Sequence, residues 1–160
     1  MNGLDRFDLE ILRIIQKDNL TPQRKIGEMV NLSAAAVQRR IKRMHENGVI
    51  KADVSIIDPS LIGCPITIVV EVEMQHDRKE LTIQAKHKFS SCKQVQQCYY
   101  VTGDVDFVLI INVATMVEYE ALTQELFFDN ENVKRYKTFV ALDRVKVNLE
   151  LPLPEWVNIR

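Results

Sequence analysis

The chain has 160 residues, of which 46% are hydrophobic and 27% charged, and its formal net charge is −1. These values are typical of a globular protein with one medium domain or two small ones, and the net charge by itself indicates no partner. The longest apolar stretch, residues 61–70, is about half of a membrane span, and three scattered cysteines do not fit a disulfide framework or a zinc site.

The charge is spread unevenly along the chain. Residues 1–52 hold ten Lys and Arg against six Asp and Glu, whereas residues 53–160 hold eleven against sixteen. A basic first third in an otherwise acidic chain suggests a part that faces nucleic acid. The N-terminus has no apolar signal-peptide core, so we expect a cytoplasmic protein that makes no contact with a membrane.

Two amphipathic helices are predicted in the first thirty residues. The apolar face of the first recurs at helical spacing, at Leu4, Phe7, Ile11 and Ile15. Asp5 is a suitable N-cap for this helix. Thr21 followed by Pro22 is typical of a capping residue and a first helical position, and predicts a second helix that runs through Val30.

A third helix is predicted after a short turn at residues 31–32. Ser33 is its expected N-cap and Gly48 its expected end, so the second and third helices form a helix-turn-helix. Residues 49–58 then alternate between apolar and polar side chains. This alternation predicts a strand, which serves either as a wing or as the link to the remainder of the chain.

Proline and glycine interrupt the pattern after this strand, and the rest of the chain has a different rhythm. We expect a helix-turn-helix domain over residues 1–52, a hinge over residues 53–64 and a second domain over residues 65–160. In the second domain we expect strands at residues 65–75, 93–102, 106–114 and 133–147. One helix is expected at residues 78–89, and a second begins after Thr115, which caps it. This βαββαβ order is the ferredoxin-like pattern, with both helices on one face of an antiparallel sheet, and the fold class is α+β.

The predicted sheet is apolar on both faces. Its third strand alternates between two apolar sets, Phe107, Leu109 and Ile111 on one side and Val108 and Ile110 on the other. Val69, Cys98 and Tyr100 are expected to extend the second apolar face. Because two helices cover only one face, we expect a second subunit to cover the other, with burial under the N-terminal domain as the alternative.

The third helix carries four basic residues within five positions. Val37, Ile41 and Met44 share its inward face, with Ala34 beside them, and the opposite face has Ala35, Arg39, Lys42, Arg43 and Glu46. We expect Arg40, at the edge of the buried face, to serve structure in part by pairing with a carboxylate of the first helix.

This outward face has the chemistry of a DNA-binding surface. Its cations suit phosphates and the acceptor edges of guanine, Gln38 can reach a base, and small residues let the helix end approach a groove closely. The expected DNA-binding residues are Ser33, Ala35, Ala36, Gln38, Arg39, Lys42 and Arg43. The alternative is a charged face that is merely solvated.

Three stretches, LDRFDLEILRIIQKD, LSAAAVQRRIKRMHENGVI and VTGDVDFVLIINV, together resemble the Lrp/AsnC family of feast-famine transcriptional regulators. The resemblance runs from Leu4 to about Leu153. It implies an N-terminal winged-type helix-turn-helix and a C-terminal ferredoxin-like effector domain. In that family the effector domain dimerises through its sheet, dimers often assemble into octamers or other rings, and amino acids such as leucine are the usual effectors.

The chain matches the family position by position, with a few departures. Residues of the recognition-helix pattern are present at Ser33, Val37, Arg40, Ile41, Gly48, Val49 and Ile50. Met44 stands where leucine is commoner, and Leu20 stands where the family usually has arginine. Val105 replaces a usual aromatic residue in the glycine-aspartate turn, and FDNENV replaces a Pro-Gly turn before the last strand.

The turn TGDVDF combines a glycine, which can take a positive φ, with two carboxylates. An aspartate can receive the ammonium group of an amino acid, and free N–H groups of the turn can receive its carboxylate. The resemblance implies that this turn lies where dimers meet, with the ligand between them. The expected effector-binding residues are Tyr99, Tyr100, Thr102, Gly103, Asp104, Asp106 and Thr138. A solvated hairpin is the alternative, and a magnesium site at the two aspartates is short of ligands.

We therefore expect a sequence-specific DNA-binding transcription regulator that is not an enzyme and needs no cofactor or metal. Its expected partners are double-stranded DNA, a small amino acid such as leucine or another aliphatic one, and further copies of the chain in a homodimer or octamer. One alternative is a small-metabolite enzyme on a ferredoxin-like scaffold, for which we find no nucleophile with a base, metal cluster or phosphate loop. The other is a protein-interaction module whose helix-turn-helix binds another protein.

Overall fold

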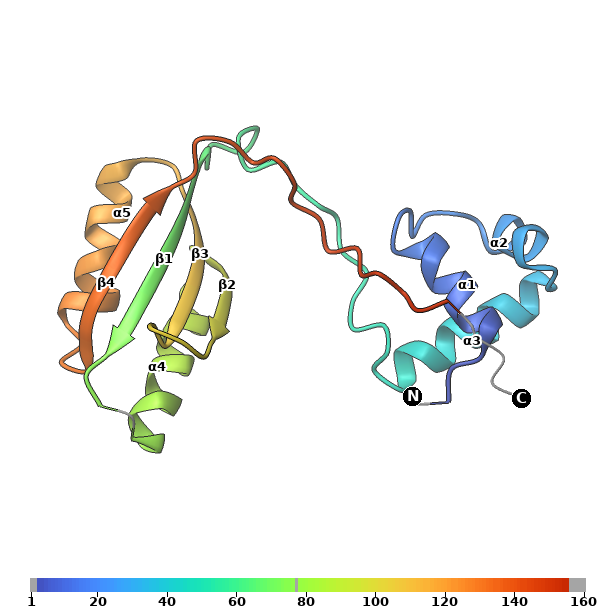
Figure 1. The fold of residues 1–160 in the computed structure, drawn as a ribbon. Helices are drawn as coiled ribbons and strands as arrows, with labels where there is room; N and C mark the ends of the chain where they lie inside the picture. Colours follow the sequence, from blue (N-terminus) through green and yellow to red (C-terminus); the bar gives the residue numbers. More distant parts are fainter. Residues whose placement is uncertain (1–2, 77, 156–160) are drawn as a thin grey trace. The chain divides into compact units, whose positions relative to one another are not determined.

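The structure is a computed structural model that describes residues 3–76 and 78–155. The chain forms two compact units (Figure 1). One contains the residues up to Ile56 together with the segment from Lys146 onward, and the other runs from Ile57 to Val145. The sequence predicts that residues 65–160 belong together, but the segment from Lys146 onward groups with the first unit because its backbone bonds to the side chains of Arg13 and Gln16, at the end of the first helix.

The first unit contains three helices, α1 (Arg6–Ile15), α2 (Gln23–Val30) and α3 (Ala34–Glu46). Asp5 caps α1 as predicted, and it does so in a reciprocal capping box. The Asp8 N–H donates to the Asp5 carboxylate at 2.9 Å, and the Asp5 N–H donates to the Asp8 carboxylate at 3.0 Å. The core of the unit consists of Ile11, Ile26, Val30, Val37 and Met44.

The turn between α2 and α3 fixes the helix-turn-helix. Asn31 takes the left-handed conformation at φ 57°, which Asn tolerates better than most residues. Ser33 then caps α3 as predicted, because its hydroxyl accepts the Ala36 N–H at 3.2 Å. Gly48 terminates α3 as predicted, from the C′ position beyond the last helical residue: it has φ 69°, and its N–H bonds the carbonyl of His45 in a Schellman motif.

Two predictions for this unit are wrong. Thr21 does not cap α2, because the helix begins one residue later and the Thr21 hydroxyl donates to the carbonyl of Asp18 at 2.9 Å. The predicted strand over residues 49–58 does not form either, and these residues pair with no strand in the described part of the chain. Apolar and polar alternation gives a strand only where a neighbouring strand accepts its backbone hydrogen bonds.

The second unit has the predicted βαββαβ order. Its elements are β1 (Ile66–Met74), α4 (Lys79–Ser91), β2 (Val95–Tyr100), β3 (Phe107–Val113), α5 (Met116–Thr123) with a π-helical extension η1 (Gln124–Phe128), and β4 (Val133–Val140). The four strands are antiparallel in the order β2-β3-β1-β4. β4 ends at Val140 instead of residue 147, because Val140 already pairs with Ile68 near the start of β1.

The two helices cover one face of this sheet (Figure 1). Ile68, Val70 and Val72 of β1 lie on that face with alternate residues of β3, and all are fully buried. Side chains from α4 and α5 complete the core, namely Ala85, Phe89, Tyr119 and Leu122.

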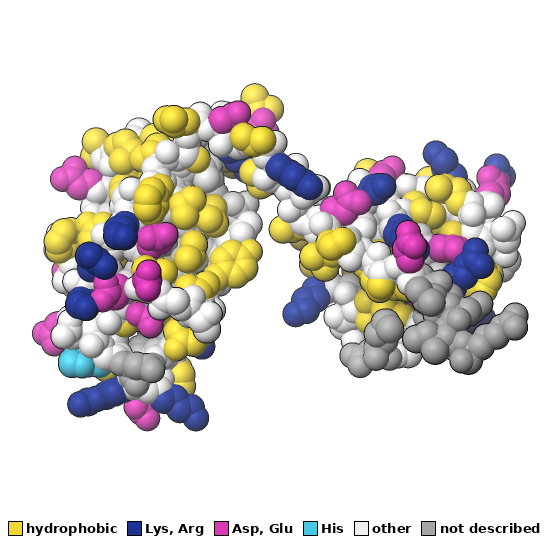
Figure 2. All heavy atoms as spheres, in the orientation of Figure 1, with side chains coloured by type: hydrophobic (Ala, Val, Ile, Leu, Met, Phe, Trp, Pro, Cys, Tyr) yellow, Lys and Arg dark blue, Asp and Glu magenta, His cyan; other side chains and the backbone are white. Residues whose placement is uncertain are grey.

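The opposite face is open, and in Figure 2 hydrophobic side chains gather over it. Val69, Val108 and Ile110 face this side, as does Phe139 of β4, so two apolar faces are present as predicted. Cys98 and Tyr100 do not belong to the open face. A register shift between Val95 and Gln97 turns them to the helix-covered side, opposite Leu109 and Phe107.

Candidate nucleic-acid interface and effector turn

The outward face of α3 carries two exposed cations that make no polar contact with another element of the described chain. Arg39 is exposed and forms no ion pair with any described residue, and the Lys42 ammonium lies 3.8 Å from the Glu46 carboxylate on the surface. Val37 and Met44, on the opposite side, are buried in the core. The helix therefore presents Arg39 and Lys42 to the exterior while its inner face holds it in place.

The first turn of α3 is small and accessible. Ser33 and Ala35 are exposed, Ala36 is half-buried and Gln38 is exposed. Ala34, which the sequence places near the inward face, is exposed as well, because the helix is seated from Val37 onward. The Ser33 hydroxyl binds the Ala36 N–H, so other N–H groups of the first turn remain available to an anion.

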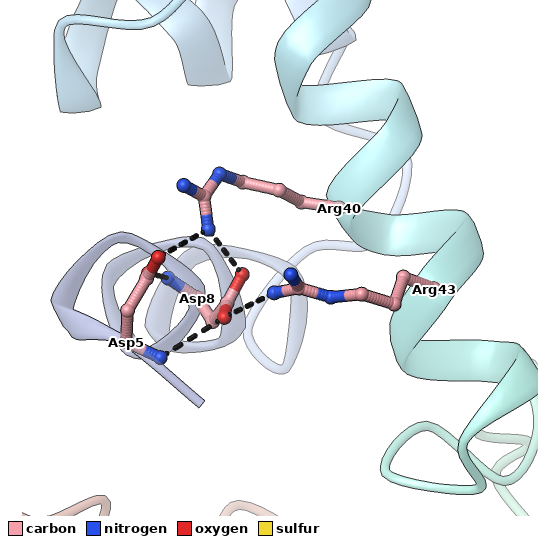
Figure 3. A network of polar contacts seen from close by, with 4 residues as sticks. All are labelled: Asp5, Asp8, Arg40 and Arg43. Carbon is pink, nitrogen blue, oxygen red and sulfur yellow. Dashed lines mark hydrogen bonds and ion pairs between the residues drawn. The ribbon is translucent and has the colours of Figure 1, made fainter. Parts of the chain in front are cut away.

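The other two arginines of α3 bind the start of α1 (Figure 3). Arg40 Nη1 donates to Asp8 Oδ1 at 2.8 Å and to Asp5 Oδ2 at 2.7 Å, which confirms the predicted pairing of Arg40 with the first helix. Arg43 Nη2 donates to Asp8 Oδ2 at 2.5 Å. Arg43, which the sequence places among the outward cations, therefore forms an ion pair with α1 of its own domain.

The charges of this cluster stabilise one another. Burial acts to lower the pKa of the Arg40 guanidinium, but hydrogen bonds to Asp8 and Asp5 outweigh this and raise the pKa above its ordinary value. Burial likewise acts to raise the pKa of the Asp5 carboxyl, whereas the Asp8 N–H and Arg40 outweigh it and leave that pKa lowered. Asp5 and Arg40 are accordingly both charged near neutral pH.

The glycine-aspartate turn joins β2 to β3. Gly103 has φ 123°, a conformation that favours glycine, which agrees with the prediction of a positive φ. The Asp106 carboxylate accepts the Met74 N–H at 2.7 Å, and the Asp106 N–H donates to the Val72 carbonyl at 2.9 Å. Asp106 therefore ties the turn to the end of β1, whereas Asp104 is exposed and pairs with no described residue.

The structure brings only some of the predicted effector residues together. Thr102, Gly103 and Asp104 are exposed on one turn. Tyr99 lies on the open face and Tyr100 on the helix-covered face, so the two hydroxyls point to opposite sides of the sheet. Thr138 is on β4, at the other edge of the sheet from β2, and its hydroxyl hydrogen-bonds that of Tyr119 at 2.5 Å.

Three features of the structure are not predicted from the sequence. Asp8 accepts hydrogen bonds from two of the three arginines of α3, Arg40 and Arg43, and the signal for this in the sequence is that Asp5 and Asp8 have the same three-residue spacing as these two arginines. A pocket of about 500 Å³ lies between α4 and the loop before β4, with Lys88 and Asp129 in its wall. Gln16 holds the backbone of the C-terminal segment, and no local sequence signal indicates this contact.

Within residues 3–76 and 78–155, no group of three or more His, Cys, Asp or Glu is placed to hold a metal ion. Among the helices of the same residues, none is long and apolar enough to cross a membrane.

Comparison with known proteins identifies both parts of the chain. The winged helix-turn-helix DNA-binding family matches residues 4–51, and the Lrp/AsnC ligand binding domain matches residues 67–151. The chain belongs to the Lrp/AsnC family of transcription regulators. As a member of this family it is a DNA-binding transcription regulator with a ligand-binding domain, and its helix-turn-helix and ferredoxin-like folds confirm the predicted fold class.

Individual proteins resemble this chain over almost their full lengths. An uncharacterised HTH-type transcriptional regulator of Sinorhizobium fredii is 40% identical, over 94% of this chain and 89% of its own. The crystal structure of an AsnC family transcriptional regulator from Agrobacterium tumefaciens is 29% identical with a TM-score of 0.87, over 94% of this chain and 97% of that one. A transcriptional regulator of Neisseria meningitidis, solved as an L-Met complex, has the same fold at 20% identity and a TM-score of 0.86, with the same coverage.

Proposed function

We propose that this Lrp/AsnC regulator binds specific DNA sites through the outward face of α3 and that a small amino acid modulates its assembly or its affinity for DNA. The observation that carries the proposal is the division of the α3 surface. Arg39 and Lys42 project from a helix whose opposite side is fixed in the core by Val37 and Met44.

The chemistry of this face suits a major groove. A guanidinium such as that of Arg39 donates two hydrogen bonds to the O6 and N7 atoms of guanine, and a lysine ammonium such as that of Lys42 neutralises a phosphate. The alanines after Ser33 leave room for the backbone to approach a phosphate. In a dimer, two such helices enter successive major grooves of a roughly palindromic site.

The test begins with selection of a preferred duplex from a pool of random sequences by the full-length protein, followed by affinity measurements on that duplex and on random DNA. We expect Arg39→Ala to weaken binding to the preferred duplex by about 5- to 150-fold, the value of one bidentate base contact, and to affect random DNA much less. Arg6→Ala is the matched control, because Arg6 is an exposed cation of the same unit that pairs with Glu10 within α1.

Selection that enriches no duplex above random DNA would contradict the proposal and favour a helix-turn-helix that binds protein. Equal losses for Arg39→Ala and Arg6→Ala would contradict the assignment of α3 as the base-reading helix.

The effector part of the proposal concerns the turn at residues 101–106. Asp104 is its available carboxylate, since that of Asp106 already binds the backbone of β1. An amino acid places its ammonium group at Asp104 and its carboxylate at N–H groups of the turn. Leucine or another aliphatic amino acid is the proposed effector, and it shifts DNA affinity only by its preference for one state of the protein, typically by about 1–3 kcal/mol.

Thermal unfolding in the presence of each of the twenty amino acids tests the effector. A ligand at one hundred times its dissociation constant stabilises the folded protein by about 2.7 kcal/mol, which a melting curve detects. We expect Asp104→Asn to abolish the shift and Asp129→Asn to leave it intact. The reverse pattern would place the effector in the pocket beside α4, where Asp129 lies.

A further inference from the structure

A single buried carboxylate organises the inner edge of the DNA-binding helix. Asp8 is fully buried, and each of its two oxygens accepts a hydrogen bond from a different arginine of α3 (Figure 3). The Asp8 carboxylate also accepts the Asp5 N–H, so this one side chain joins the cap of α1 to two turns of α3. Arg40 lies in addition over the ring of Phe7, 5.5 Å from its centre.

The cluster balances its own charge. Two guanidinium groups face two carboxylates, and within the cluster both oxygens of Asp8 are taken. Arg43 nevertheless remains 45% exposed, so its side chain borders the same surface as Arg39 and Lys42. If Arg43 bound a DNA phosphate instead, Oδ2 of the fully buried Asp8 carboxylate would keep only the Asp5 N–H, so the exchange of Asp8 for a phosphate would cost free energy.

We propose that Asp8 is a specificity-determining residue that withholds Arg43 from the DNA backbone, and that Arg40 and Arg43 are positioning residues that seat α3 on α1. This inference rests on the proposed function, because it takes α3 as the helix that faces the duplex. It assigns contact with DNA to Arg39 and Lys42 and assigns orientation of the helix to the two arginines that bind Asp8.

The proposed division has a physical consequence for selectivity. Each phosphate that a protein neutralises releases counterions and adds about 0.9 to the slope of log affinity against log salt, on any sequence alike. A third mobile cation on α3 would therefore strengthen binding to all DNA. Because Asp8 holds Arg43, this arginine does not add to the affinity for DNA of any sequence. The same contacts fix the angle of α3 relative to α1 and so preserve the alignment of Arg39 with a base edge.

The test is a salt titration of DNA binding by full-length variants, on the selected duplex and on random DNA. Arg43→Gln is expected to leave the salt slope on random DNA equal to that of the wild type and to weaken binding to the selected duplex. Lys42→Gln, the matched control on the same helix, is expected to lower the slope by about one on both. If Arg43→Gln lowers the slope by about one, Arg43 contacts phosphate and the inference is overturned.

Asp8→Asn supplies the converse experiment, because it removes the charge that holds Arg43. We expect a slope on random DNA that is steeper by up to about one, together with a smaller ratio of specific to non-specific affinity. Thermal unfolding and circular dichroism establish whether this variant folds. If it does not fold, the slope of the Arg43→Gln variant alone decides, because Arg43 is half-exposed and its replacement leaves the Arg40–Asp8 contact in place.

The result separates this inference from the proposed function. If the wild type selects no duplex and its binding is insensitive to Arg39→Ala and Lys42→Gln, the proposed function fails and the inference fails with it. If those two variants behave as expected but Arg43→Gln matches Lys42→Gln, only the role of Asp8 and Arg43 is refuted.

Discussion

At the scale of the single residue, the backbone of the turn after α2 lies close to α2 at Gly27. This glycine is buried, and a Cβ atom on it would overlap the carbonyl oxygen of Leu32. The Leu32 N–H donates to the Gly27 carbonyl at 2.9 Å, so the two segments are held together at this point. The angle between α2 and α3 therefore depends on the absence of a side chain here.

We predict that Gly27→Ala lowers the free energy of unfolding of the DNA-binding unit by about 1–3 kcal/mol, the usual effect of an added group in a packed site. The higher helix propensity of alanine offsets only part of this loss. Urea denaturation with hydrogen exchange in α2 measures the effect, and Glu28→Ala at the exposed neighbouring position is the control. Unchanged protection of α2 in Gly27→Ala would contradict the prediction.

Residues whose roles are local can be predicted from the sequence, as Asp5, Ser33 and Gly48 show. Each acts on backbone groups within five positions of itself, so spacing along the chain is sufficient information. Asp8 and Arg43 are 35 positions apart, and their pairing depends on the angle between two helices. Periodicity predicts that Arg43 is exposed, and it is, but periodicity cannot show that the Arg43 guanidinium turns toward a buried carboxylate of α1.

At the scale of the element, the segment after residue 145 is held at the end of α1 by the side chain of Gln16, which hydrogen-bonds its backbone in the way that a neighbouring strand would. Gln16 accepts the Leu151 N–H and donates to the Leu151 carbonyl, both at 3.1 Å. Arg13 donates to the carbonyl of Pro154, and Lys17 lies 3.8 Å from the Glu150 carboxylate. Because the segment forms no helix or strand, the polar contacts that hold it in the described part of the chain are these side-chain contacts.

We predict that Gln16→Ala accelerates amide exchange at residues 146–155 by about fivefold, because the two hydrogen bonds together contribute about 1 kcal/mol at an exposed site. Hydrogen exchange followed by mass spectrometry measures this change. Gln23→Ala, at the exposed start of α2, is the control and should leave exchange in this segment unaltered. Equal exchange in Gln16→Ala and the wild type would show that other contacts hold the segment.

The strands and helices themselves show where pattern reasoning reaches its limit. Alternation predicts β1 and β3 well, because both are central strands with partners on each side. It fails for residues 49–58, which have the pattern but pair with no strand that the structure describes. On the edge strand β2, the register shift at Val95 and Gln97 reverses the sides of Cys98 and Tyr100, and nothing in the sequence marks that extra residue.

At the scale of the whole molecule, the open face of the sheet is divided into an apolar and a charged part. Val69, Ile110 and Phe139 form neighbouring apolar positions on three strands. Further along the same face, Glu73 binds Lys134 and Arg135, at 2.5 and 2.8 Å, and these contacts lower the pKa of its carboxyl. We propose that a second copy of the chain covers this face, since a two-fold interface pairs one patch with itself and the charged part fixes its orientation.

A single substitution on the open face can test the proposed dimer. We predict that the wild type sediments as a dimer and the Ile110→Lys variant as a monomer, because dimer formation through this face would bury the lysine ammonium group without a partner. The position is only half-buried within the chain and lies opposite Val69, so the substitution leaves the core under α4 and α5 intact. Val117→Lys adds the same charge at an exposed apolar position of α5 and should leave the dimer unchanged. A wild type that is monomeric, or an Ile110→Lys variant that remains dimeric while folded, would show that the open face is not the surface that joins two subunits.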